Sequence, residues 1–234
     1  MASPGDNEHQ SKNRKKKAAI GKEIGGRWPL IKPKKDLQIN RLKGTNLFTI
    51  ANFFSSIESK AYVEAAESFG FIHQGSQGPA KGEAFRDNDR MSVTDPLLAE
   101  IIWQSGLKRV FDDIKLQGKV AVGLNPNIRF YRYTVGQRFG RHIDESVDLG
   151  GGQTTQYTLL IYLTGKSSNK DKSLQSLAGG ETVFYDQGRG IVAEVAPVEG
   201  MALLHIHGHK CMLHEARTVM KNTKYVLRSD VVFA

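Results

Sequence analysis

The chain has 234 residues, of which 39% are hydrophobic and 24% charged, and its formal net charge is +9 at pH 7. This length supports one sizeable core rather than two full domains. The single cysteine excludes an intramolecular disulfide, and no apolar run approaches the about 20 residues of a membrane helix. Because no signal-peptide pattern opens the chain, we expect an intracellular protein, in the nucleus or cytoplasm, without a membrane partner.

The positive charge is concentrated near the N-terminus. Residues 1–43 hold twelve Lys and Arg against four Asp and Glu, so this segment carries a net charge of +8. Like charges without apolar periodicity cannot bury enough surface to fold, so we predict a basic, largely disordered tail over 1–43. Within it, KNRKKK at 12–17 is typical of a nuclear-localisation signal or a weak nucleic-acid contact, and equally of a solvated tail.

Residues 44–124 are predicted to form a helical support region. Ser55 offers an N-cap hydroxyl to a first helix, whose apolar positions recur at helical spacing until Gly70. A second helix, capped by Thr94 or Asp95, carries a broad apolar stripe. We therefore expect two helices packed against the rest of the fold.

The polar stretch between these helices, Gly75 to Arg90, is predicted to be a loop. Arg86, Asn88 and Arg90 stand at alternating positions within it. They either line one side of a substrate groove or are ordinary loop polarity, because loops carry function only where a rigid scaffold presents them.

From residue 127 to the end the pattern changes to short strands rich in aromatic and β-branched residues. Glycine-containing turns separate them, which predicts a sandwich or jelly roll with the helices outside it. The polar stretch 165–178 interrupts this rhythm and is predicted to be a mobile insertion that can act as a lid. The expected strands are 128–134, 157–163, 182–185, 191–195, 201–207 and 224–233.

Three residues in this half have the types and spacing of a metal site. His142 and Asp144 are two residues apart, so an extended segment would direct both to one side. With the distant His214 they form the donor set of a 2-His-1-carboxylate centre, which holds Fe(II) and leaves positions open for substrates.

A rival metal site is visible in the same half. His205, His207 and His209 alternate shortly before His214. Neutral imidazoles suit zinc, copper and iron alike, so this strand can itself form a zinc or cupin-like site. Otherwise these three histidines are packed residues or orient a ligand.

Several motifs in one order resemble the prolyl 4-hydroxylase-like, Fe(II)- and 2-oxoglutarate-dependent dioxygenases. The resemblance covers residues 125–234, whereas residues 44–124 match no motif of the family. HxD alone is weak, but its combination with GGETxF, a distal histidine and a cation ten residues later is specific. The order is Tyr133…His142-Ile143-Asp144…Tyr162…Gly179-Gly180-Glu181-Thr182-Val183-Phe184…Gly200…His214-Glu215…Lys224.

The resemblance implies a mainly β fold with flanking helices (α+β). Its core would be a double-stranded β-helix, or jelly roll, over 125–234, with the mobile insertion at 165–178 and an N-terminal helical layer. It also implies that the catalytic centre is an Fe(II) ion bound by His142, Asp144 and His214.

The resemblance further implies a pocket for 2-oxoglutarate. By position, Lys224 would hold the 5-carboxylate of this co-substrate, and Arg228, on the same strand face, would be its partner or substitute. Tyr133 and Tyr162 match positions where the family places a phenol near 2-oxoglutarate. The other implied requirements are O2, and ascorbate as the reductant.

The implied activity is hydroxylation of an unactivated C–H bond, with release of succinate and CO2. The expected substrate is a prolyl or other side chain of a protein or peptide. Two alternatives remain at this stage. One is a nucleic-acid-directed dioxygenase, which the basic tail suggests although the paired-arginine spacing of nucleic-acid demethylases is missing after His214. The other is a catalytically silent metal-binding jelly-roll module.

Overall fold

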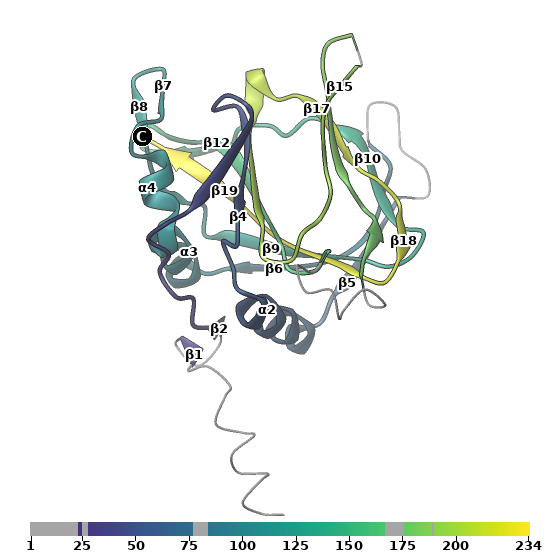
Figure 1. The fold of residues 1–234 in the computed structure, drawn as a ribbon. Helices are drawn as coiled ribbons and strands as arrows, with labels where there is room; N and C mark the ends of the chain where they lie inside the picture. Colours follow the sequence, from purple (N-terminus) through teal and green to yellow (C-terminus); the bar gives the residue numbers. More distant parts are fainter. Residues whose placement is uncertain (1–22, 25–27, 77–83, 167–175, 189) are drawn as a thin grey trace, which may run out of the picture.

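The computed structural model describes residues 23–24, 28–76, 84–166, 176–188 and 190–234 (Figure 1). Its helical segments are α2 (Ser56–Phe69), α3 (Pro96–Ile102), the π-helical turn η2 (Trp103–Leu107), α4 (Lys108–Phe111) and the 3-10 turn η4 (Gly208–Lys210). Its strands are β1 (Glu23–Ile24), β2 (Trp28–Pro29), β3 (Gln38–Lys43), β4 (Leu47–Ala51), β5 (Ile72–Gly75), β6 (Arg86–Thr94), β7 (Lys115–Leu116), β8 (Lys119–Leu124), β9 (Asn127–Tyr133), β10 (Arg138–His142), β11 (Asp148–Gly150), β12 (Gln153–Tyr162), β13 (Ala178–Gly179), β14 (Thr182–Tyr185), β15 (Ile191–Val195), β16 (Ala202–Ile206), β17 (Leu213–Ala216), β18 (Val219–Lys221) and β19 (Lys224–Phe233).

Most of these strands belong to one antiparallel sheet that curls into a barrel-like core, with α2, α3 and α4 on its outside (Figure 1). The order along the sheet is β15-β14-β17-β10-β6-β9-β19-β12-β16-β4-β3. Except for the pairs β14-β15 and β3-β4, neighbours in this order are not consecutive in the sequence, as expected for a jelly roll. The predicted mainly β, jelly-roll fold with flanking helices is confirmed.

The central strands β9, β12 and β19 each direct side chains to both faces of the curled sheet. In β12, Leu159 and Ile161 pack in the large apolar core beside helix residues such as Leu98. Thr158 and Leu160, the intervening residues, line a cavity inside the barrel. Successive side chains of a strand point to opposite faces, so one set holds the helices and the other builds an interior pocket.

Helix α2 begins where the sequence predicts, because Ser55 and Glu58 form a capping box. The Glu58 carboxylate accepts hydrogen bonds from the backbone N–H of Ser55 at 2.7 Å and of Lys32 at 2.6 Å. It also accepts from the Lys34 ammonium at 2.8 Å. Burial opposes ionisation of this carboxyl, but the bond from Lys34 and the backbone donors outweigh it and lower its pKa. One buried carboxylate thus joins the helix start to the chain that precedes β3.

The second predicted helix is interrupted. Asp95 caps α3, and its carboxylate accepts from the backbone N–H of Leu98 at 3.0 Å. The helix then passes into the π-helical turn at Trp103, because Gly106 has a φ of 149° that no α-helix contains. A Cβ at Gly106 would also lie 3.3 Å from the Lys34 carbonyl oxygen, so the positive φ and this close backbone contact favour glycine here.

Two predicted boundaries are wrong in part. The tail predicted as largely disordered over 1–43 contains β2 and β3, and β3 exists because it pairs with β4 although all six of its residues are exposed. The region 44–124 is not purely helical, since it supplies strands β4 to β8.

Residues 12–17 and 167–175 lie outside the described residues. The nuclear signal, the nucleic-acid contact and most of the insertion over 165–178 therefore stay predictions.

The stretch Gly75 to Arg90 is also not a simple loop. Arg86, Asn88 and Arg90 belong to β6, which pairs with β9 and β5. The polar residues of β6 are stabilised by ion pairs, and Asp89 binds Arg132 at 2.9 Å.

No helix among the described residues is long and apolar enough to cross a membrane.

Glu58→Gln should lower the free energy of unfolding by about 2 kcal/mol, because a neutral amide replaces a buried, charged acceptor. Urea unfolding at neutral pH measures this change. The exposed Glu64 of the same helix provides the control, and Glu64→Gln should change stability by less than about 0.5 kcal/mol.

The difference should also depend on pH. Since the folded-state pKa of Glu58 is depressed, its contribution is present above the usual glutamate pKa and is lost as pH falls through the folded value. Equal stability of wild type and Glu58→Gln at neutral pH would contradict this role.

Candidate active site

The three predicted metal ligands lie side by side in the folded chain. His142 ends β10, where it pairs with His214 of β17, and Asp144 follows just beyond the strand. The Nε2 atoms of His142 and His214 lie 3.8 and 3.7 Å from the carboxylate oxygens of Asp144. One ligand atom from each residue lies within 4.8 Å of the other two. Such a cluster can enclose one cation.

Both histidines present the same nitrogen to this cluster. The Nδ1 atom of His142 lies 2.8 Å from the Gly140 carbonyl oxygen, and that of His214 lies 2.9 Å from the Met212 carbonyl oxygen. A carbonyl only accepts, so each Nδ1 carries the proton and each Nε2 keeps a lone pair. Burial lowers the pKa of His142 to about 3 and also lowers that of His214. Both rings are neutral, the form in which imidazole binds a metal.

Asp144 is held in its ionised form. Burial opposes ionisation, but the Arg228 guanidinium, with one nitrogen 3.1 Å from Oδ1, outweighs it and sets the pKa of Asp144 well below its usual value. The other oxygen, Oδ2, accepts from the Thr158 hydroxyl at 2.8 Å. The backbone N–H of Asp144 donates to the Cys211 sulfur at 3.2 Å. The carboxylate is therefore fixed at both oxygens and at its backbone.

A chain of hydrogen bonds leads to Asp144 from the interior of the barrel. The Thr155 oxygen accepts from the Val147 backbone N–H at 2.9 Å, which leaves its own proton for Nε2 of His207 at 3.1 Å. Nδ1 of His207 then donates to the Thr158 oxygen at 3.1 Å, and Thr158 donates to Asp144. With the protons placed in this way, each N–H or O–H group of this hydrogen-bond chain donates one hydrogen bond. The Thr158 proton, the last in the chain, points at the Asp144 carboxylate.

Lys224 lies buried at the other end of the interior cavity, which has a volume of about 40 Å³. Its ammonium donates to the Gly180 carbonyl oxygen at 2.6 Å and lies 5.3 and 5.5 Å from the ring centres of Tyr133 and Tyr162. Burial lowers its pKa to about 7, and the charge of Glu181 offsets this only in part. This arrangement can bind an anion, because a lysine ammonium has three donors.

The two glycines of the GGETxF motif are explained by the backbone conformation and close contacts next to Lys224. Gly179 and Gly180 have φ values of 76° and 72°, a left-handed conformation that favours glycine. A Cβ on Gly179 would collide with the Thr218 carbonyl oxygen, and one on Gly180 would lie 3.0 Å from Cδ of Lys224. Gly180 therefore leaves room for the lysine and supplies its acceptor, whereas Gly179 allows the chain to pass close to Thr218.

Both predicted tyrosines lie near Lys224, and Tyr133 also lines the cavity. Tyr133 of β9 pairs directly with Lys224 across the ladder. The Tyr162 hydroxyl bonds the Thr182 hydroxyl at 2.7 Å. Burial raises the pKa of both phenols, so they are neutral hydrogen-bonding groups.

Arg228 shares a strand face with Lys224, as predicted, and both line the cavity. Their positions differ, however. A guanidinium nitrogen of Arg228 lies 3.1 Å from Asp144 and 3.5 Å from Asp230, so this side chain is at the carboxylate end. Four residues of a strand span about 13 Å, which separates the two cations along the cavity.

A wider cleft of about 910 Å³ opens onto His142 and Asp144 from outside. At its base the Phe139 ring stacks on the His142 ring, with centroids 3.7 Å apart, and the Arg86 guanidinium lies 4.2 Å above Phe139. Arg86 thus lines a groove, whereas Asn88, two residues further along β6, is fully buried.

The rival histidine site does not form among the described residues. His209 is exposed on η4, and His207 is engaged by the two threonines. His205 is fully buried beside Asp144 instead, with Nε2 3.6 Å from Oδ2. The alternating spacing in the sequence therefore does not produce a common site.

Comparison with known protein families identifies the chain. Residues 128–229 match the family model described as the 2OG-Fe(II) oxygenase superfamily. This part of the chain has the sequence pattern of that superfamily. The protein is a 2-oxoglutarate-dependent dioxygenase, and the family implies Fe(II), 2-oxoglutarate and O2. The predicted family and enzyme class are confirmed. No curated protein matched the sequence.

Solved structures show the same fold for this oxygenase. A viral collagen prolyl hydroxylase from Paramecium Bursaria Chlorella virus-1, in complex with 2OG, is 18% identical with a TM-score of 0.56, over 83% of this chain and 99% of that one. A Trichoplax adhaerens prolyl hydroxylase, in complex with a hypoxia inducible factor peptide fragment, is 15% identical with a TM-score of 0.56, over 97% and 94%. A Pseudomonas putida prolyl-4-hydroxylase is 14% identical with a TM-score of 0.50, over 80% and 91%.

Sequence reasoning missed two residues that the oxygenase places against the predicted ligands. Thr158 bonds Asp144, and Phe139 stacks on His142. Thr158 could have been found from Tyr162, because residues four apart in a strand share a face. Phe139 has no such signal, since its contact depends on how β10 meets β6 and β17.

Thr158→Val should lower the free energy of unfolding of the metal-free oxygenase by about 2 kcal/mol, because His207 and Asp144 each lose a buried partner. Urea unfolding in the presence of a chelator measures this. Thr154→Val, on the same strand but bonded to the side chain of Gln156, should cost less than about 0.5 kcal/mol. Equal effects of the two substitutions would show that the hydrogen-bond chain contributes nothing.

Proposed function

We propose that the enzyme hydroxylates a prolyl or other side chain of a protein, using Fe(II) bound by His142, Asp144 and His214. The observation that carries this proposal is the convergence of two neutral imidazole lone pairs and one carboxylate within 4.8 Å. This donor set suits Fe(II), which prefers two imidazoles and one carboxylate on one face. Fe(II) bound there, with 2-oxoglutarate and O2, supplies oxidative decarboxylation to succinate and CO2 and hydroxylation of a C–H bond.

The chain's own groups then have distinct tasks. Backbone carbonyls fix the tautomers of the two histidines, and the Thr158 hydroxyl orients the Asp144 carboxylate. Hydrogen bonds of this kind set the direction and basicity of metal ligands. Arg228 balances the charge of Asp144 and holds it in place, so we assign it a positioning role.

We propose that Lys224 binds the 5-carboxylate of 2-oxoglutarate. It is the cation at the cavity end remote from Asp144, and Gly180 leaves room beside it. Tyr133 lines this end and Tyr162 lies beside Lys224, and both phenols can donate to a carboxylate. Arg228 already has two carboxylate partners, which favours Lys224 for this task.

The substrate proposal rests on the cleft outside the cluster. Its volume of about 910 Å³ suits a peptide segment, and His142 and Asp144 are among the residues that line it. Phe139 offers an apolar ring, and Arg86 and Arg141 offer cations at the rim. The Trichoplax neighbour, which has the same fold, is a prolyl hydroxylase in complex with a peptide fragment.

The proposal predicts that the protein, supplied with Fe(II), 2-oxoglutarate and ascorbate, releases succinate and adds one oxygen atom to proline-containing peptides. His142→Ala should abolish both signals, because it removes one of three metal ligands. Mass spectrometry of a peptide library measures oxygen addition, and succinate is measured in parallel.

The matched control is His73→Ala, an exposed histidine on β5 that should leave both signals near wild type. Equal succinate release by wild type and His142→Ala would remove the iron-site assignment. If succinate is released but no proline-containing peptide gains an oxygen atom, the iron-site assignment stands and the proposed substrate is wrong.

Lys224 gives a second prediction, on pH. Its free-state pKa is about 7, so above this pH the lysine must take up a proton when it binds the 2-oxoglutarate carboxylate. Affinity for 2-oxoglutarate should therefore fall by up to about tenfold per pH unit above roughly pH 7, and this dependence should vanish below it. Anaerobic calorimetry in buffers of different ionisation enthalpy measures the proton uptake.

Two variants test the same assignment. Lys224→Arg keeps a cation that does not titrate in this range, so its binding should lose the pH dependence. Lys224→Ala should raise the KM for 2-oxoglutarate about 100-fold or more, through loss of a buried charge partner. If Arg228→Ala raises that KM further than Lys224→Ala does, the anchoring role belongs to Arg228.

A further inference from the structure

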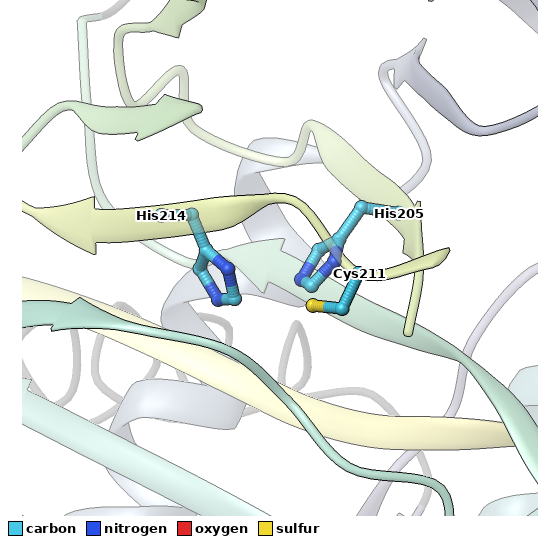
Figure 2. A group of neighbouring side chains, drawn as sticks. All are labelled: His205, Cys211 and His214. Carbon is cyan, nitrogen blue, oxygen red and sulfur yellow. The ribbon is translucent and has the colours of Figure 1, made fainter. Parts of the chain in front are cut away.

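A second group of metal-binding side chains lies beside the proposed iron site and shares one residue with it. His205 of β16, Cys211 before β17 and His214 of β17 each place a ligand atom within 4.8 Å of the other two. Figure 2 shows the two rings and the sulfur converging on one small region. The ring centroids of the two histidines are 4.6 Å apart. The proposed iron site does not use His205 or Cys211.

His205 has an unused ligand atom in this group. Its side chain is fully buried, and within the described chain Nε2 has no hydrogen-bond partner. Nδ1 lies 3.3 Å from the Ile206 carbonyl oxygen, so the proton resides there and Nε2 keeps its lone pair. A buried polar atom without a partner costs about 1–3 kcal/mol. A metal bond to Nε2 would remove this cost.

Cys211 supplies the donor that gives the group its selectivity. It is the only cysteine of the chain, and the Asp144 backbone N–H donates to its sulfur at 3.2 Å, which fixes its position. Thiolate sulfur selects Zn(II) and Cu(I), whereas the proposed iron site offers nitrogen and oxygen only. A metal that reaches this thiol deprotonates it outright.

We propose that His205, Cys211 and His214 form a second metal site, which binds a thiophilic cation and Zn(II) above all. Zn(II) bound there excludes Fe(II) from the iron site, because both metals need His214. On binding, a metal–sulfur bond forms, the thiol proton passes to solvent, and no group is oxidised or reduced. Zinc bonds of about 2.0–2.1 Å to nitrogen and 2.3 Å to sulfur place tetrahedral ligands roughly 3.3–3.6 Å apart. Shifts of roughly 1 Å from the present spacing complete the site.

The fourth position of a tetrahedral ion falls to a water molecule or to Asp144. Oδ2 of Asp144 lies 3.6 Å from Nε2 of His205 and 3.7 Å from Nε2 of His214. Either occupant leaves His142 outside the zinc site. The exclusion of iron rests on the proposed function, whereas the zinc site itself does not.

Co(II) titration of the full-length, metal-free protein tests the site, because a cobalt–thiolate bond gives a strong near-ultraviolet absorption. A single cysteine means that this band reports Cys211 alone. We expect the band at one equivalent of Co(II), its loss on adding Zn(II), its retention in His142→Ala, and its loss in Cys211→Ser and His205→Gln. Absence of the band from wild type, or an undiminished band in His205→Gln, would overturn the site.

X-ray absorption of the zinc-loaded wild type needs no variant and protects the test against misfolding of His205→Gln. One sulfur at about 2.3 Å from zinc supports the site, and a shell without sulfur overturns it. Anaerobic Fe(II) should suppress the cobalt band in wild type but not in His142→Ala. If Fe(II) suppresses neither, the iron assignment fails and the second site stands.

Discussion

The alternation of side chains along three central strands is the constraint on which this molecule depends. In β9, β12 and β19 one set of residues packs against the helices, and the other set projects into the barrel. Because the period of a strand is two, a slip of β19 by one residue would turn Lys224 toward the apolar core and the core residues of β19 toward the pocket. Core packing therefore enforces the geometry of the site.

Much of the fold follows from the sequence for the same reason. Strands β15 and β19 have the predicted limits, and the cap at Ser55 starts α2 where expected. Strands β3 and β6 were missed, because neither has an apolar face of its own. Strand β3 is entirely exposed and exists through its partner β4, and β6 is stabilised by charges from distant strands, such as Arg132. Long-range pairing of this kind leaves no local periodic signal.

The candidate site, like the fold, could be predicted from the sequence only in part. Residue types and spacing point to His142, Asp144 and His214 as a metal-binding set, but only the family motifs and the fold separate this set from the rival histidines His205, His207 and His209. The sequence does not separate the tasks of Lys224 and Arg228, because strand alternation directs both inward. Only the cross-strand partners do so, since they place Arg228 beside Asp144 and Lys224 beside Gly180. The unpaired nitrogen of His205 is likewise visible only once β16 and β17 are placed together.

The ion pair between Arg228 and Asp144 bears on how the enzyme acquires its metal. A guanidinium nitrogen lies 3.1 Å from the carboxylate oxygen Oδ1, so the metal-free pocket already contains a cation bound to one of its ligands. On the proposed assignment, the guanidinium keeps Asp144 ionised and fixes its direction before the metal arrives. The metal then meets a ligand that needs neither to lose a proton nor to turn.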